Sequence, residues 1–335
     1  MPKVKNISKY VFFILLPFII ILISLCVGAY YVPITDIFKI FMSKFTHSNY
    51  GIEEIATSII FDTRLPRIIG AVMAGAGLAV SGSVFQCIFK NPLADPYTLG
   101  VSNGAGFGAA IAIIMSVPAL SVQVISMAFG IFAVILTFLL SIKNNKSTAT
   151  LILSGMLVSA LFSSLVSLIK FVADPFEKLP QIIYWLMGTM VGINYSKIFY
   201  ILPAYIIAML IIFLYRWRIN VLSMGDIQAK SFGIDVKKDR MVVIIASTLI
   251  TSLIVSISGI IGWVGIVIPH LARILVGPDF RKLMPVSISL GISYFLIIDD
   301  ICRSLTSMEI PIGVVTGIIG IPVFVYFIYT RKVSW

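Results

Sequence analysis

Long apolar runs separated by short polar connections recur along the whole chain. A helix needs roughly 20 apolar residues to cross about 30 Å of hydrocarbon, and every backbone amide there must be satisfied internally. The pattern therefore predicts an all-α polytopic membrane protein, a single transmembrane domain over residues 1–335 with about ten transmembrane helices. We expect these spans at residues 10–32, 68–86, 98–116, 120–141, 149–172, 198–215, 241–258, 260–276, 284–301 and 311–329.

Three segments between the spans are long enough to hold structure of their own. Residues 33–63 mix polar and apolar positions and form the expected first external segment. Residues 216–240, RWRINVLSMGDIQAKSFGIDVKKDR, contain two glycines that bracket a short helical stretch, which predicts a cytoplasmic helix pair. The apolar piece 181–190 is too short to cross a bilayer and predicts a re-entrant or interfacial helix.

The distribution of charge predicts the topology. The chain carries 25 Lys and Arg against 14 Asp and Glu, and 59% of its residues are hydrophobic. If Lys3, Lys5 and Lys9 are cytoplasmic, most of the other basic residues also fall on cytoplasmic connections, which predicts cytoplasmic termini and an even number of spans. The first apolar run is too long for a secretory signal and lacks a cleavage site, so we interpret it as an uncleaved span.

Composition excludes two broad classes of function. So apolar a chain is not an ordinary soluble enzyme. Its basic residues are scattered singly between apolar runs rather than clustered on one face, which argues against a nucleic-acid partner despite the net charge of +11. Three cysteines, Cys26, Cys87 and Cys302, have spacings that match neither a metal site nor a disulfide framework, so we expect them to pack in the interior.

Catalytic chemistry has little support in the sequence. The two histidines, His47 and His270, are assigned to opposite sides of the membrane, and no clustered metal ligands or nucleophile–base pair is present. No G-x-x-x-x-G-K-[ST] phosphate loop occurs, so any ATP-driven step would require another polypeptide. We therefore predict no catalytic residue, no metal site and no cofactor on this chain.

An acidic pair raises the alternative of an ion-coupled secondary transporter. Asp299 and Asp300 lie near a span, where carboxylates are costly and often mark ion pathways. However, Arg303 follows them at i+4 and i+3 on one helical face, which favours ordinary ion pairing at the outer end of the ninth span.

Small residues gather in two ladders, AVMAGAGLAVSG at 71–82 and GVSNGAGFGAA at 100–110. Small side chains allow membrane helices to approach closely, so close packing is the prediction for both. Between the ladders, KNPLADP combines one basic residue with two prolines and predicts a tight cytoplasmic turn.

Several stretches together resemble the permease subunits of ATP-binding-cassette (ABC) importers for ferric siderophores, haem and cobalamin. The resemblance implies the type II ABC importer permease fold. The stretches are RLPRIIGAVMAGAGLAVSGSVFQCIFKNPLADPYTLGVSNGAGFGAA, LSMGDIQAKSFGIDVKKDR, SGIIGWVGIVIPHLARILVGPDFRKLMP and DDICRSLTSMEIPIGVVTGIIGIPVFVYFI. The resemblance implies a bacterial cytoplasmic membrane protein that pairs with a second permease chain, identical or paralogous. It also implies two ATP-binding subunits, which carry ATP and Mg, and an extracytoplasmic substrate-binding protein.

The resemblance also implies roles for particular residues. Exposed arginines would meet carboxylates of the binding protein, namely Arg64, Arg67 and Arg303. Residues 216–240 would couple to the ATPase through Leu222, Met224, Gly225, Ala229, Phe232 and Gly233. The cytoplasmic gate would comprise Asn144, Asn145, Ser147 and Thr148, and the translocation path would be lined by Ser159, Ser163 and Ser167. His270 and Arg273 of PHLAR are expected to be structural.

The function we expect is inward transport of a ferric siderophore by a permease subunit, with the ATPase activity on a separate subunit. Haem and cobalamin remain open as cargo. The alternative from another class is an ion-coupled secondary transporter, and a non-transporting membrane scaffold ranks last.

Overall fold

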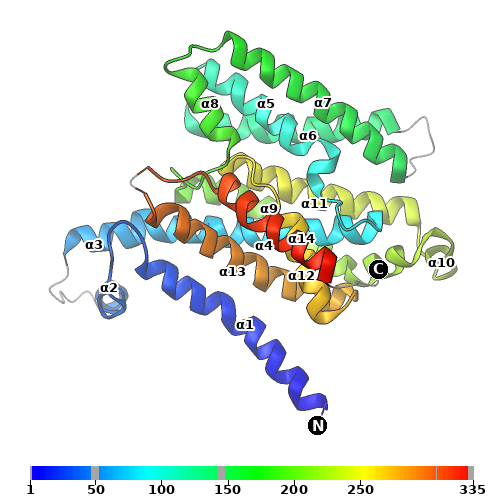
Figure 1. Cartoon of the computed structure of the whole chain (residues 1–335), viewed down its shortest axis with the longest axis horizontal. Coiled ribbons are helices and arrows are strands. Elements are labelled where there is room, and N and C mark those ends of the chain that lie inside the picture. Colours follow the sequence, from blue (N-terminus) through cyan, green and yellow to red (C-terminus); the bar gives the residue numbers. More distant parts are fainter. Residues whose placement is uncertain (1, 47–52, 142–147, 307, 331–335) are drawn as a thin grey trace.

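The protein is described by a computed structural model covering residues 2–46, 53–141, 148–306 and 308–330. These residues form helices without any strand (Figure 1). Two short helical segments are irregular, the π-helix Ile59–Arg64 and the 3-10 helix Pro96–Leu99. The α-helices are α1 Pro2–Cys26, α2 Ile34–Thr46, α3 Glu54–Ser58, α4 Leu65–Phe89, α5 Val101–Ile114, α6 Ala119–Ser141, α7 Thr148–Val172, α8 Lys178–Leu186, α9 Tyr195–Met224, α10 Asp226–Ser231, α11 Val236–Ser258, α12 Val264–Val276, α13 Phe280–Ser304 and α14 Ile312–Thr330.

Each of the ten expected spans coincides with a helix. Within the described residues, six helices are long and apolar enough to cross a membrane, and four shorter apolar helices occupy the remaining positions. The two spans that are nearly continuous in sequence are separate helices, α11 and α12, because the chain turns at Gly259–Trp263. Gly259 and Trp263 both have positive φ, 68° and 71°.

Helix bounds differ from the expected ones on the polar side of the spans. Helix α9 continues past Arg216 and Arg218 to Met224, so residues 216–240 are the end of a long helix, the short α10 and the start of α11, rather than a separate helix pair. The short apolar piece 181–190 falls largely within α8. A membrane helix need not end at its first charged residue, because its backbone hydrogen bonds can continue beyond the apolar region.

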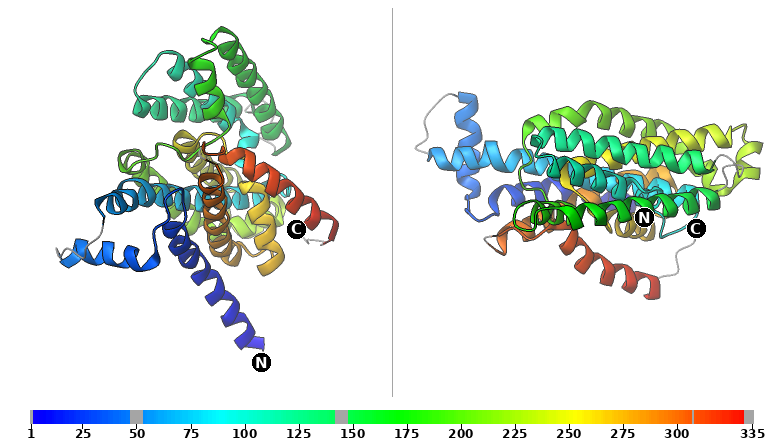
Figure 2. Two further views of the ribbon diagram at one scale, coloured as in Figure 1. Left: turned by 60° about the vertical axis from the view of Figure 1, so that its left-hand side comes forward. Right: turned by 90° about the horizontal axis from the view of Figure 1, so that it is seen from above.

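Helix α4 is the centre of the fold. Its most apolar window is 89% buried, and it packs against α13, α11, α12 and α9. Helices α5 to α8 form a second group beside this central group (Figures 1 and 2). Helix α1 packs against α13 on the side opposite this second group. Helices α2 and α3 lie at one end of the bundle and α10 at the other end (Figure 2).

The small-residue ladders allow these close approaches, as predicted. A Cβ placed on Gly82 of α4 would lie 1.9 Å from the carbonyl oxygen of Gly265 in α12, and one on Gly75 would lie 2.3 Å from the carbonyl oxygen of Gly291 in α13. A Cβ on Gly104 of α5 would lie 2.6 Å from the carbonyl oxygen of Phe129 in α6. Backbone-to-backbone contact of this kind admits only glycine.

The KNPLADP turn closes the α4–α5 hairpin. Lys90 ends α4 in the left-handed conformation, with φ 50° and ψ 38°. Asp95 Oδ1 accepts hydrogen bonds from the backbone nitrogen and the hydroxyl of Thr98, both at 3.1 Å, and caps the 3-10 helix that follows. Burial raises the pKa of Asp95 to about 6.

Candidate functional sites at the two ends of the bundle

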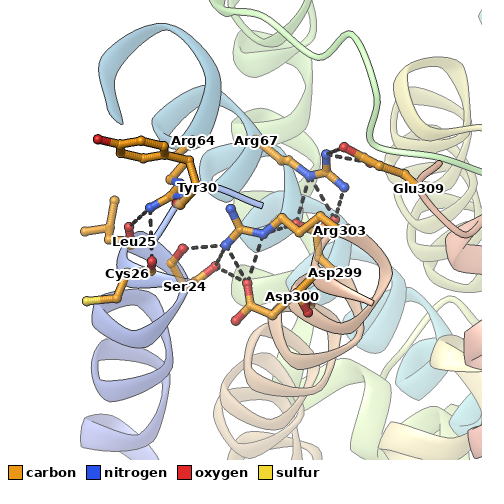
Figure 3. A network of polar contacts seen from close by, with 11 residues as sticks. Ser24, Leu25, Cys26, Tyr30, Arg64, Arg67, Asp299, Asp300, Arg303 and Glu309 are labelled. Carbon is orange, nitrogen blue, oxygen red and sulfur yellow. Dashed lines mark hydrogen bonds and ion pairs between the residues drawn. The ribbon is translucent and has the colours of Figure 1, made fainter. Parts of the chain in front are cut away.

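The end that carries α2 and α3 holds a cluster of buried arginines and carboxylates (Figure 3). The π-helix delivers Arg64 to the start of α4, and Arg67 follows one turn later. The last turns of α13 supply Asp299, Asp300 and Arg303. We call these five residues the polar cluster.

Arg67 joins three segments that are distant in sequence. Its Nε and Nη2 donate to Asp299 at 2.9 to 3.0 Å, and its Nη1 lies 2.7 Å from the carboxylate of Glu309 in the connection to α14. Asp299 is fully buried and accepts from both nitrogens of the guanidinium fork. Such bidentate geometry gives the pair a fixed orientation as well as charge compensation.

Arg303 makes the second ion pair of the polar cluster, as the sequence predicts. Its Nη2 lies 2.6 Å from Asp300 Oδ1, and its Nε lies 3.8 Å from Asp299 Oδ2. Ser24 of α1 donates its hydroxyl to Asp300 at 2.7 Å and accepts from Arg303 at 2.9 Å. Both carboxylates that suggested an ion pathway are therefore engaged in ion pairs.

Arg64 binds backbone rather than carboxylate. Its guanidinium donates to the carbonyl oxygens of Leu25, Cys26 and Tyr30, where α1 ends (Figure 3). Arg64, Arg67 and Arg303 are 3%, 6% and 7% exposed, so the expectation that they are exposed guanidiniums is wrong. Their internal partners explain the burial, because an unpaired buried charge would be very costly. A role in docking the binding protein stays a prediction.

The opposite end presents α10 as an apolar projection. Met224, Ile227 and Phe232 are 58%, 80% and 59% exposed, whereas Leu222 and Ala229 are buried against the bundle. Arg240 pairs with Asp226 at 2.5 Å and ties α10 to α11. Of the expected coupling residues, Met224 and Phe232 are thus available to a partner, and Leu222 and Ala229 instead support the helix.

Glycines at both ends of α10 set its direction. Gly225 and Gly233 have φ of 122° and 75°, which disfavours other residues. The expected set omitted Ile227, the most exposed apolar side chain of α10. Its signal in the sequence was a large apolar residue on a short helix outside the spans.

An open pocket of about 620 Å³ lies beside α10, and sequence reasoning did not anticipate it. Asn220 organises its wall, because its side chain donates to Asp279 at 2.6 Å and accepts from the backbone nitrogen of Phe280 at 2.6 Å. Hydrogen bonds from Arg281 and Asn220 hold the pKa of Asp279 well below its usual range, at about 2. The pocket walls are lined by Gln86, Cys87, Lys90, Trp217, Asn220, Val221, Ser223, Met224, Phe232, Arg273, Pro278, Asp279 and Arg281.

The expected gate lies mostly outside the described residues. Asn144, Asn145 and Ser147 fall there, and so does the side chain of Thr148, the first residue of α7. Its role as a gate stays a prediction.

The expected path residues lie on α7 at the edge of the bundle. Ser163 and Ser167 are exposed, and Ser167 donates its hydroxyl to the Ser163 carbonyl at 3.0 Å. Ser159 is half-buried, and its carbonyl accepts from Asn103 at 3.2 Å. Two of the three serines are thus exposed on the outer surface of the chain. Their role in lining a translocation path stays a prediction.

PHLAR places His270 at the α12–α14 contact. His270 is 4% exposed and meets the ring of Phe324 edge-on at 5.3 Å. Within the part of the chain that the structure describes, no group of three His, Cys, Asp or Glu side chains could hold a metal ion.

Comparison with known proteins shows the family. The chain is 40% identical to the molybdate import system permease protein MolB of Haemophilus influenzae, over 92% of each chain. It is 33% identical to the iron(3+)-hydroxamate import system permease protein FhuG of Bacillus subtilis, over 81% of this chain and 83% of that one. A solved metal-chelate type ABC transporter in an inward-facing conformation superposes with a TM-score of 0.86 at 38% identity, over 97% of this chain and all of the other. Residues 15–330 match the FecCD transport family, so the chain belongs to this family of multi-pass transport permeases.

Proposed function

We propose that this chain moves its cargo into the cytoplasm together with a second permease chain, powered by two separate ATP-binding subunits and supplied by an extracytoplasmic substrate-binding protein. The observation that carries the proposal is α10, a short helix at one end of the bundle, which together with its two flanking residues exposes three large apolar side chains, Met224, Ile227 and Phe232. An apolar surface of this kind outside the spans suits contact with a partner protein.

The charge around α10 supports one orientation of the chain in the membrane. Lys230, Lys237 and Lys238 are exposed at this end of the bundle, and Arg218 lies nearby through its ion pair with Asp239. Basic residues beside spans favour the cytoplasmic side. We therefore place α10 and both termini in the cytoplasm, and the polar cluster at the external end.

Ion-coupled secondary transport is the rival function, and the polar cluster argues against it. Such transporters often use a carboxylate that binds and releases an ion near the middle of the membrane. Asp299 and Asp300 are instead paired with Arg67 and Arg303 at the end of the bundle. Because each carboxylate is held by an arginine, the polar cluster suits a structural role.

For the cargo we propose a ferric siderophore, with molybdate as the second candidate. FhuG is named for iron(3+)-hydroxamate import, and the more similar MolB is named for molybdate import. Haem and cobalamin follow, and two relatives are named as cobalamin or vitamin B12 import permeases. Binding of labelled ferric hydroxamate, catecholate, haem, cobalamin and molybdate to the cognate binding protein decides among them.

Copurification tests the proposed assembly. A tagged full-length chain, extracted in mild detergent, should retain an ATP-binding subunit that contains a phosphate-loop motif. A chain that purifies without any such subunit, while cells depleted of ATP still take up the cargo, would contradict the proposal.

A further inference from the structure

A groove of about 410 Å³ runs between α6 and α11. Because an apolar cavity of about 150 Å³ holds benzene, the groove has room by volume for roughly sixteen carbon atoms. Its walls consist of one face of each helix, with side chains at helical spacing. The lining residues are Ile131, Val134, Ile135, Phe138, Leu139, Met241, Ile245, Thr248 and Leu249.

Among the described residues that line the groove, Thr248 is the only polar one, and its hydroxyl is satisfied. It donates to the carbonyl oxygens of Ile244 at 2.8 Å and Ile245 at 3.0 Å. Along α11, the wall from Met241 to Leu249 extends about 12 Å, close to the roughly 15 Å depth of one leaflet's hydrocarbon. The chemistry and the depth of the groove therefore fit a hydrocarbon chain.

Two lysines stand at the mouth of the groove. Lys237 and Lys238 are exposed on the first turn of α11, and Lys238 precedes Met241 and Ile245 by three and seven residues, on the same helical face. Among the described residues neither lysine forms an ion pair with a carboxylate. Asp239 is paired with Arg218 at 2.8 Å, and Asp235 accepts from the backbone nitrogen of Lys238 at 3.1 Å. The mouth thus offers cationic side chains where a lipid headgroup would lie.

We propose that this groove binds one anionic phospholipid of the adjacent leaflet, with an acyl chain between α6 and α11 and the phosphate at Lys237 and Lys238. The combination of a dry groove and a basic mouth matches both parts of such a lipid. Figure 1 shows α6 in the group of α5 to α8 and α11 in the central group. The acyl chain fills part of the seam between these two groups and supports their packing.

Native mass spectrometry of the full-length chain tests the proposal. After delipidation, the chain should bind phosphatidylglycerol in preference to phosphatidylcholine. Lys237→Gln with Lys238→Gln should weaken phosphatidylglycerol binding roughly 30-fold, because each lysine contributes a factor of about five. The matched control, Lys230→Gln with Lys282→Gln, removes the same charge from exposed lysines outside the groove and should leave binding unchanged. Equal binding of both lipids, or equal losses in the two double variants, would overturn the proposal.

A second measurement locates the lipid. Phosphatidylglycerol with a photoreactive group in its acyl chain should label peptides that contain 131–139 and 241–249, and Ile245→Trp, which fills the groove from an exposed wall position, should abolish this labelling. Labelling confined to other helices would overturn the assignment. A separate bifunctional lysine reagent that joined two copies of the chain through Lys237 or Lys238 would also overturn it, because a second copy would then occupy the groove.

Discussion

Arg67 of α4 and Asp299 of α13 form a buried ion pair, with 2.9 Å between Nη2 and Oδ1. Their side chains are 8% and 0% exposed, and 232 residues separate them in the sequence. The same guanidinium reaches Glu309, in the connection that leads to α14. The pair therefore fixes the Arg67 end of the central helix α4 against two later segments of the chain.

Breaking this pair on one side should strongly destabilise the fold. Arg67→Met leaves Asp299 as a buried charge without its main partner, a loss expected to cost about 3–5 kcal/mol. Removing both partners, as Arg67→Met with Asp299→Leu, should recover a large part of that loss, because two apolar side chains leave no charge uncompensated. Thermal unfolding in detergent measures the stability of the single and the double variant.

The exposed pair Lys39 and Asp36 serves as the control for this series. Their side chains are 51% and 40% exposed, so Lys39→Met should change stability by less than about 1 kcal/mol. If Arg67→Met were as harmless as Lys39→Met, the structural role of the buried pair would be refuted.

Gly82→Ala should disrupt the contact between α4 and α12. The added Cβ would overlap the Gly265 carbonyl oxygen at 1.9 Å, so a backbone shift is unavoidable. We expect a loss of about 3 kcal/mol or more, at the upper end for overpacking. Gly262→Ala is the control, because nothing lies within 4 Å of its Cβ position. Equal melting temperatures for the two variants would contradict the close approach.

Ile227→Asp should uncouple the permease from its ATPase without unfolding it. The side chain is 80% exposed, so the fold loses little when it becomes charged. Burying a carboxylate at the partner interface should reduce ATPase copurification and uptake about tenfold or more. Ala229→Asp, at a fully buried position, should instead lower thermal stability. Normal uptake by Ile227→Asp would remove α10 from the coupling surface.

The KNPLADP turn predicts a pH dependence. Because burial raises the pKa of Asp95 to about 6, above about 4 in the unfolded chain, its stabilising contribution is complete below about pH 4 and is lost as the pH rises through 6. Asp95→Asn keeps a side-chain cap and removes the titration. Melting temperatures from pH 4 to 7.5 should therefore favour the variant increasingly at higher pH, and parallel curves would contradict this.

The sequence was most informative where the physics is local. Apolar run lengths located the helices, and the i+3 spacing predicted the pairing of Asp300 with Arg303. Burial of Arg64 could not be predicted, because its partners are carbonyl oxygens at the far end of α1. Arg67 likewise depends on Glu309, 242 residues away. The division of α10 into buried Ala229 and exposed Ile227 depends on how this helix packs against α9.

The most direct test of the central claim is uptake by proteoliposomes that contain the complete complex of permease chains and ATP-binding subunits, with the loaded binding protein added outside. In vesicles whose ATP-binding subunits face the interior, the account predicts that uptake requires ATP and Mg inside. An ionophore should leave this uptake unchanged. Uptake that proceeds without ATP and collapses with the ionophore would contradict it.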